Sequence, residues 1–249
     1  MEDMLLMRKS IRKYKSEPIP EQTLDYILQA GIRASNCGNM QLYSVIVTED
    51  KQRKKAYAPL HFNQSMVEDA AVVLTVCADV NRFNKWCEIN SADKSLNNFL
   101  FLNIATIDAT IMAQSMTAAA ESKGLGVCWL GTVNYMADKI AEFFNLPQGV
   151  VPVACLTVGV PDENPEPTER LPLNAVVHKE VYRDYSPQEI KDMYKDIEQN
   201  PVNIQYVKEN NLENLAQVFS QVRYAKAGNE EFSARYRQFV EKTFIDGKL

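Results

Sequence analysis

LNNFLFLNIATIDATIMAQSMTAAA, residues 96–120, is the stretch that decides the architecture of this 249-residue chain. Its length, its apolar character and the glycines that follow it, Gly124 and Gly126, predict one long helix over residues 96–122. Polar side chains interrupt the stretch at Asn97, Asn98, Asn103, Asp108 and Gln114. A membrane-spanning helix rarely tolerates that many polar groups, so we expect a buried helix inside a protein and no membrane span.

The predicted helix is apolar around nearly all of its circumference, which creates a problem of burial. One protomer of 249 residues would struggle to cover every face of such a helix. A two-fold dimer that packs the helix against its mate is the simpler solution. The sequence therefore predicts a homodimer.

Shorter elements lie on both sides of the long helix. Strands are predicted at residues 44–48, 70–78, 127–130 and 150–160. Further helices are predicted at residues 3–9, 20–32 and 136–144, and after the capping sequence SPQE at residues 186–189. The strands are too few and the helices too long for a doubly wound fold, so an α+β fold with a sheet flanked by helices is favoured.

Composition excludes several classes of protein. The net charge is −5 and the pI is near 5.3, which disfavours binding to nucleic acid, because phosphate neutralisation needs clustered Lys and Arg. The N-terminus lacks the features of a secretory signal. Five scattered cysteines and two histidines indicate neither disulfides nor a metal site, so we expect a cytoplasmic protein without bound metal.

Two polar segments are candidates for ligand binding. RKSIR, residues 8–12, places three cations and a hydroxyl within five residues, a set that binds phosphate but is also typical of a solvated helix end. The loop SNCGNMQ, residues 35–41, offers carboxamides that suit a heterocycle edge, and it also fits an ordinary polar turn. Arg170, in the Pro-rich segment 161–172, is either a surface charge or a second phosphate ligand.

No side chain presents itself as a nucleophile or a base. The glycines at 124, 126 and 131 have the wrong spacing for a dinucleotide fingerprint, and neither His61 nor His178 lies in a nucleophile motif. An enzyme without such a group is most easily explained if a cofactor carries the chemistry.

The ordered series of segments resembles the FMN-dependent nitroreductase family, in particular its oxygen-insensitive NADPH nitroreductase and NADPH–flavin reductase branch. The matching segments are RKSIRKY (residues 8–14), RASNCGNMQ (33–41), QSMVEDAA (64–71), ESKGLG to WLGT (121–132), LPQGVVP (146–152), GVPDENP (159–165) and RLP (170–172). The resemblance implies an antiparallel-type sheet flanked by helices and an intertwined homodimer. It also implies an FMN-binding core over residues 1–185 and a helical extension over 186–249 that packs on the core or on the partner subunit.

The resemblance also assigns residues, position by position. It implies that the FMN phosphate and ribityl end are held by Arg8, Lys9, Ser10 and Arg12, with Arg170 reaching the same phosphate. The ribityl hydroxyls and the ring edge would be addressed by Asn36, Asn39, Gln41 and Gln64. The ring would be lined by Trp129, Leu130, Gly131 and Thr132. No catalytic side chain is assigned.

The implied activity is a ping-pong reduction of nitro-aromatic, quinone or similar small electrophiles by NAD(P)H. Two departures weaken the preference for NADPH: Thr168 replaces a lysine usual before the loop arginine, and residues 226–231, KAGNEE, replace a basic loop. Glu230 and Glu231 would repel a 2′-phosphate. The alternatives are a flavin reductase that supplies reduced FMN and a flavin-binding protein without reductase turnover.

Overall fold

The computed structural model describes residues 2–244. The described chain forms two compact units, one of residues 2–166 with 233–244 and one of residues 167–232. The functional division expected at residue 185 stays a prediction; the compact units divide at other positions.

The first unit is built on a four-stranded antiparallel sheet with the strand order β1-β2-β4-β3. The strands are β1 (Tyr43–Thr48), β2 (Val72–Asp79), β3 (Gly126–Trp129) and β4 (Val150–Gly159). Every residue of the two central strands, β2 and β4, is buried, because both faces of the sheet are covered. The expectation of an α+β fold with an antiparallel sheet is confirmed.

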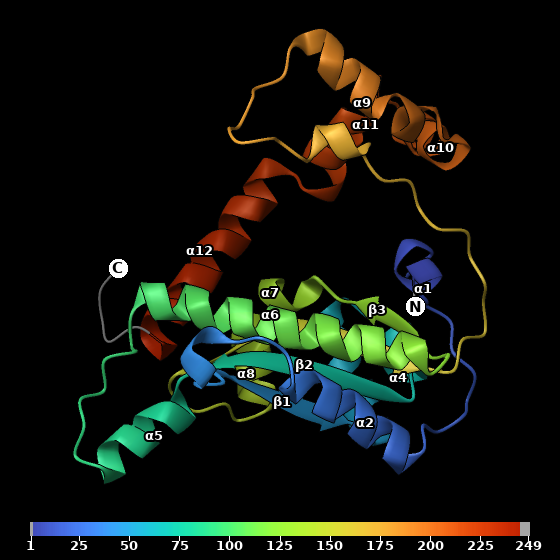
Figure 1. Ribbon diagram of the computed structural model, residues 1–249. Coiled ribbons are helices and arrows are strands. Elements are labelled where there is room, and N and C mark those ends of the chain that lie inside the picture. The colour runs from blue at the N-terminus through green and yellow to red at the C-terminus, as the bar shows by residue number, and fades with distance from the viewer. Residues whose placement is uncertain (1, 245–249) are drawn as a thin grey trace. The chain divides into compact units, whose positions relative to one another are not determined.

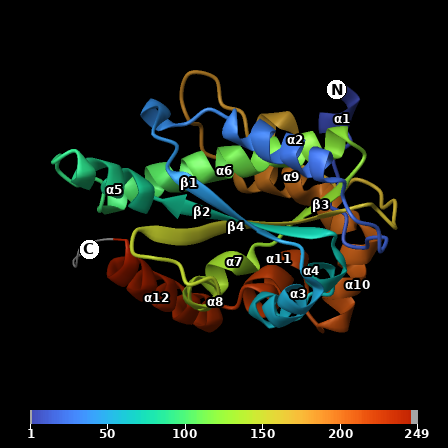
Figure 2. The same cartoon turned by 90° about the horizontal axis from the view of Figure 1, so that it is seen from below.

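Helices cover both faces of this sheet (Figure 2). One face packs against α2 (Glu21–Ile32) and α6 (Phe99–Ser122), which lie side by side (Figure 1). The opposite face packs against α3 (Lys51–Tyr57), α4 (Met66–Asp69), α7 (Thr132–Tyr135) and α8 (Ala137–Phe143). The first unit also contains α1 (Glu2–Leu6), α5 (Asn81–Ile89) and short 3-10 turns at Cys37–Asn39 and Ala58–His61.

A capping residue, Asn98, defines the N-terminus of the long helix α6. Asn98 accepts a hydrogen bond from the backbone N–H of Phe101, so the helix starts at Phe99 rather than at residue 96. After its C-terminus the chain turns at Gly124, whose φ is +75°.

By length and composition α6 is the one helix of the described chain that could cross a membrane, but it packs on the sheet. Only 39% of its most apolar window is buried, and Leu100, Ile107 and Ile111 recur at helical spacing as exposed residues. The expected helix is confirmed, and the described residues of the first unit leave one of its apolar sides uncovered.

The core beneath α3 and α8 contains a buried polar network around His61. The His61 side chain is 0% exposed, and its ring contacts the ring of Tyr57 edge-on, with 4.6 Å between centroids. Its Nδ1 lies 2.6 Å from Oγ1 of Thr132, and its Nε2 lies 3.8 Å from Sγ of Cys155. Burial lowers the pKa of His61 to about 4, so the ring is neutral at neutral pH.

The second unit is helical: α9 (Pro187–Gln199), α10 (Pro201–Glu209), α11 (Leu215–Gln217), a π-helical turn (Val218–Arg223) and the first part of α12 (Lys226–Thr243), after a 3-10 turn at Leu173–Ala175. The expected capping box at the start of α9 is confirmed, since Ser186 and Glu189 exchange hydrogen bonds. Residues 226–231, which stand where the resembling branch carries a basic loop, form the first turns of α12. The backbone N–H of Asn229 bonds the carbonyl of Ala225, which closes a helical turn.

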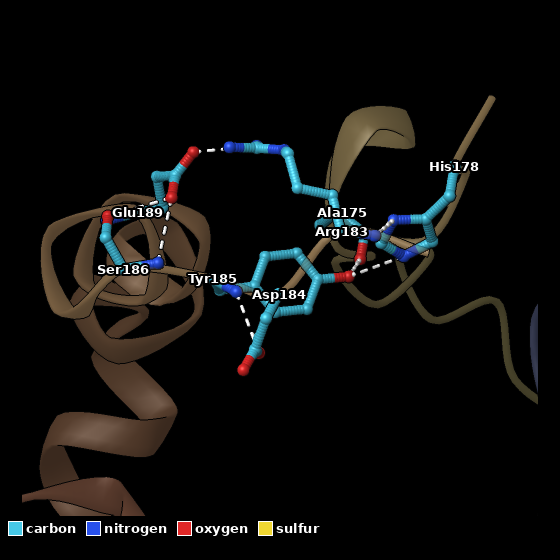
Figure 3. A network of polar contacts seen from close by, with 7 residues as sticks. All are labelled: Ala175, His178, Arg183, Asp184, Tyr185, Ser186 and Glu189. Carbon is cyan, nitrogen blue, oxygen red and sulfur yellow. Dashed lines mark hydrogen bonds and ion pairs between the residues drawn. The ribbon is translucent and has the colours of Figure 1, made fainter. Parts of the chain in front are cut away.

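A polar network joins the segment before α9 to that helix (Figure 3). The backbone N–H of Arg183 donates to Nδ1 of His178 at 3.2 Å, and Nε2 lies 3.0 Å from the hydroxyl of Tyr185. That hydroxyl donates to the carbonyl of Ala175, so Nε2 carries the proton of His178. Arg183 also pairs with Glu189 at 2.7 Å, which ties the segment to the capping box.

The buried His61 generates a prediction about pH. Its pKa is depressed from 6.5 to about 4 in the folded protein, so the unfolded chain binds the extra proton first as the pH falls. The contribution of neutral His61 to the free energy of unfolding is therefore fully present above pH 6.5. As the pH falls towards 4 this contribution is lost, which lowers the free energy of unfolding by about 3 kcal/mol.

Urea unfolding of wild type and of His61→Gln at several pH values between 7 and 4 measures this loss. We expect the difference in unfolding free energy between wild type and variant to shrink as the pH falls. A difference that stays constant across that range would contradict the prediction.

Candidate functional site

The basic segment at the N-terminus is held against the start of β3. The backbone N–H of Ile11 donates to the carbonyl of Val127 at 3.1 Å, and the buried Tyr14 hydroxyl donates to the carbonyl of Ile11 at 2.6 Å. The approach is close because position 126 is glycine: a Cβ there would lie 2.6 Å from the Cβ of Ile11. Ile11 and Tyr14 are buried and anchor the segment. The polar residues at positions 8–10, 12 and 13 therefore lie beside the edge strand β3.

Carboxylates offset part of the positive charge of this segment. Arg8 pairs through Nε with Glu121 at 3.4 Å, and Lys9 donates to the side chain of Asn164 at 2.6 Å. The carboxylate of Glu163 accepts from the backbone N–H groups of Arg12 and Lys13. The side chain of Arg12 is exposed and makes no ion pair within residues 2–244.

The segment that carries the cations lies beside β3, because Ile11 bonds Val127 of that strand. Burial raises the pKa of the Cys128 thiol, and the positive charges of Arg12 and Arg8 oppose that rise. Ser10, which lies between Arg8 and Arg12 in the sequence, is half-buried. Such a set, two guanidinium groups, an ammonium and a hydroxyl, has the chemistry of a phosphate site.

The residues after β3 form the other end of this region. A Cβ at Gly131 would meet no atom within 4 Å, so the surface in front of this backbone is open. Leu130 is buried and donates its N–H to the carbonyl of Cys155 at 2.9 Å, which fixes the strand edge. Thr132 is half-buried and begins α7. The space at Gly131 lets a ligand approach the backbone.

Gln64 lies on the same side as Thr132, and His61 connects them. The side-chain Nε2 of Gln64 donates to the carbonyl of His61 at 3.1 Å, while the ring of His61 contacts the Thr132 hydroxyl. The carboxamide oxygen and the second N–H of Gln64 remain available to a ligand. His61 was not among the predicted site residues, although it lies three residues before the predicted Gln64.

Trp129 has a different orientation from its neighbours. Its indole N–H donates to Oγ1 of Thr117 on α6 at 3.0 Å, so the ring packs in the core between the sheet and α6. The ring-lining role expected for Trp129 stays a prediction.

The Ser/Asn-rich loop is held by two other parts of the chain. The backbone N–H of Cys37 donates to the buried carboxylate of Asp108 on α6 at 2.9 Å. Arg82 donates to the carbonyl of Gln41 and, at 3.2 Å, to that of Tyr43.

Inside the loop, the Asn36 side chain accepts from the N–H of Gln41 at 3.2 Å. The backbone of Asn39 and Gln41 is left-handed, with φ of +54° at both positions. The loop therefore presents a fixed set of amide groups, consistent with ligand binding.

The loop and the basic segment lie at opposite corners of the sheet. The loop leads into Tyr43, which pairs with Ala78 at one end of β2, whereas Gly126 pairs with Gly159 beside the other end. Those ends are roughly 23 Å apart along the eight residues of β2. β1 and β3 are also the two edge strands, about 14 Å apart across the sheet. One protomer therefore does not bring all the predicted site residues together.

Arg170 belongs to the second unit. Its Nη1 donates to the carbonyl and hydroxyl oxygens of Thr168, at 3.1 and 2.7 Å, and to the carbonyl of Glu169 at 3.0 Å. The guanidinium is thus folded back on its own segment, and its phosphate role stays a prediction.

Comparison with known proteins agrees with the motifs. Residues 5–160 match the sequence profile of the Nitroreductase family. An FMN reductase [NAD(P)H] of Bacillus subtilis (strain 168) is 36% identical over 176 residues, 70% of this chain and 71% of that protein. An NADPH-flavin oxidoreductase of Vibrio harveyi is 33% identical over 189 residues, 76% of this chain and 77% of that protein.

A solved structure matches nearly the whole chain. The crystal structure of a Bacteroides fragilis NCTC 9343 protein shares 40% sequence identity over 98% of this chain and 99% of that one, with a TM-score of 0.96. The fold, the order of the motifs along the chain and the similar proteins all point to the same family. This chain belongs to the nitroreductase family.

Proposed function

We propose that this chain is an FMN-dependent oxidoreductase that transfers electrons from NAD(P)H to small electrophiles at the edge of β3. The observation that carries the proposal is the placement of these groups at β3: the basic segment, residues 8–12, bonds this strand through Ile11, and the open backbone of Gly131 follows the strand, with Thr132 and Gln64 both bonded to His61. The names of the relatives support FMN and NAD(P)H as its cofactors.

The donor set fits FMN group by group. Arg8, Lys9, Ser10 and Arg12 hold the phosphate, mainly through side chains, because Glu163 already occupies the backbone N–H groups of Arg12 and Lys13. Gln64 and the backbone of Gly131 and Thr132 address the ring, whereas the backbone N–H of Leu130 already bonds the carbonyl of Cys155. Bound FMN supplies the chemistry, by accepting two electrons from the nicotinamide and passing them on. The protein orients the ligands and offers N–H groups to developing negative charge.

A homodimer completes the site in this proposal. The amides of Asn36, Asn39 and Gln41 lie at the far corner of the sheet from the basic segment, so they address a flavin held by the partner's β3 edge. The exposed apolar side of α6 is the matching interface.

A reductase that releases reduced FMN is a second candidate function, favoured by relatives named as FMN reductases. The two are separated by turnover kinetics, because a releasing enzyme treats free FMN as a saturable substrate while an enzyme with resident FMN needs none added.

Four of the five free cysteines are buried thiols, in keeping with the proposed cytoplasmic location.

The phosphate assignment predicts a difference between two flavins. Arg12→Ala removes a charge-assisted contact worth about 1.5–3 kcal/mol, so FMN binding should weaken roughly 10- to 150-fold. Riboflavin lacks the phosphate, and its binding should change little. Quenching of flavin fluorescence measures both dissociation constants. Lys13→Ala, an exposed cation next in sequence, is the matched control and should leave both near wild type. Equal losses for FMN and riboflavin would refute the phosphate role.

The interface assignment predicts that a charge on α6 separates the subunits. Ile107 is 49% exposed within one chain, and Ile107→Glu would bury a carboxylate between two helices. We expect wild type to sediment at about twice the 28.3 kDa chain mass, and the variant to shift towards the monomer with weaker FMN retention. Ile107→Leu should remain dimeric. A monomeric wild type at micromolar concentration would overturn the interface.

The start of α12 predicts the choice of nicotinamide. Lys226 pairs with Glu230 at 3.7 Å, and Glu231 follows, so a 2′-phosphate near Lys226 meets two carboxylates. We expect kcat/KM for NADH to equal or exceed that for NADPH at low ionic strength. Glu230→Gln should move the ratio towards NADPH by about two- to fivefold, as exposed pairs allow. Glu241→Gln breaks a similar pair with Arg237 and should leave the ratio unchanged. A tenfold preference of wild type for NADPH would contradict this assignment.

A further inference from the structure

We propose that His61 is a positioning residue that holds Thr132 and Gln64 in the orientations in which they address the flavin. The inference rests on the proposed function, because Thr132 and Gln64 are residues through which the chain is proposed to contact FMN. His61 itself has no exposed surface and touches no ligand.

Two hydrogen bonds connect His61 to these residues from one position in the chain. The imidazole Nδ1 lies 2.6 Å from the Thr132 hydroxyl, although 71 residues separate the two in sequence. The His61 carbonyl accepts from the carboxamide of Gln64 at 3.1 Å. One residue thus fixes a rotamer on the segment after β3 and another on the turn before α4. Within residues 2–244, these are the only hydrogen bonds that the side chains of Thr132 and Gln64 make.

The ring is itself held rigidly. Tyr57 packs edge-on against it, and the Tyr57 hydroxyl bonds Thr75 on β2 at 3.0 Å. Sγ of Cys155 on β4 also lies 3.8 Å from Nε2. These contacts leave the imidazole one orientation, so Thr132 is anchored to the centre of the sheet. Burial keeps the imidazole neutral at neutral pH, so it adds no positive charge next to Thr132.

Anchoring has a consequence for ligand binding. A hydroxyl that already bonds His61 presents its remaining hydrogen-bonding capacity in one fixed direction, and it does not lose rotamer freedom when FMN arrives. Without the anchor, the side chain of Thr132 would sample other rotamers, and FMN binding would have to order it.

Two near-isosteric variants separate the Thr132 contact from the packing role of the ring. His61→Asn places an amide near the position of Nδ1 and keeps a partner for Thr132, whereas His61→Gln places its amide near Nε2 and loses that partner. We expect His61→Gln to weaken FMN binding about three- to tenfold and to shift the flavin midpoint potential, as loss of one buried hydrogen bond allows. His61→Asn should stay within about twofold of wild type.

Thr132→Val serves as the second arm of a double-mutant cycle. If His61 acts through Thr132, His61→Gln with Thr132→Val binds FMN no more weakly than Thr132→Val alone. Strictly additive losses, or a wild-type dissociation constant and potential in His61→Gln, overturn the proposal. Melting temperatures of the FMN-free variants identify effects on folding alone. Such an effect would lower the melting temperatures of His61→Asn and His61→Gln alike.

A measurement on the wild-type protein covers the case in which neither variant folds. The chain has only two histidines, so imidazole ¹⁵N resonances are readily assigned between His61 and His178. We expect addition of FMN to shift the Nδ1 resonance of His61 and not those of His178. Binding of FMN with no change at His61 overturns the proposal. Failure of wild type to bind FMN at all overturns the proposed function together with it.

Discussion

The central strands β2 and β4 are buried along their whole length, and most other features follow from that constraint. A sheet with two apolar faces needs helices on both sides. In this chain α2 and α6 cover one face, and α3, α4, α7 and α8 cover the other. Only the edges of the sheet remain for binding, so the candidate site lies along the edge strand β3. There the backbone of Gly131 is open and the N-terminal segment supplies cations.

Electrostatics at this edge are balanced rather than simply positive. Glu121 and Glu163 each contact the basic segment, and burial raises the pKa of Glu121 while Arg8 opposes the rise. In a chain of net charge −5, such pairs hold the cations in place without an incoming phosphate. The exposed guanidinium of Arg12 then becomes the group with most to gain from a phosphate, which gives it the largest expected effect on FMN binding.

The buried network at His61 connects the core beneath α3 and α8 to the candidate site. Tyr57, which bonds Thr75, and Cys155 contact the imidazole, and the imidazole contacts Thr132 at the start of α7. Packing on this face of the sheet therefore sets the orientation of a surface residue.

The sequence by itself determined the elements whose causes are local. The four strands, the long helix α6 and the capping box of α9 lie within a few residues of their predicted bounds, because periodicity and capping act over one or two turns of chain. The order of the motifs was enough to identify the nitroreductase family.

Only the tertiary structure decided what depends on distant residues. Pairing of the strands put the loop of Asn36 and Gln41 at the opposite corner from Arg12, and packing on Thr117 turned Trp129 towards α6. The contact between His61 and Thr132 joins positions 71 residues apart. No local pattern encodes such contacts, because they arise when two apolar faces of one sheet are covered at the same time.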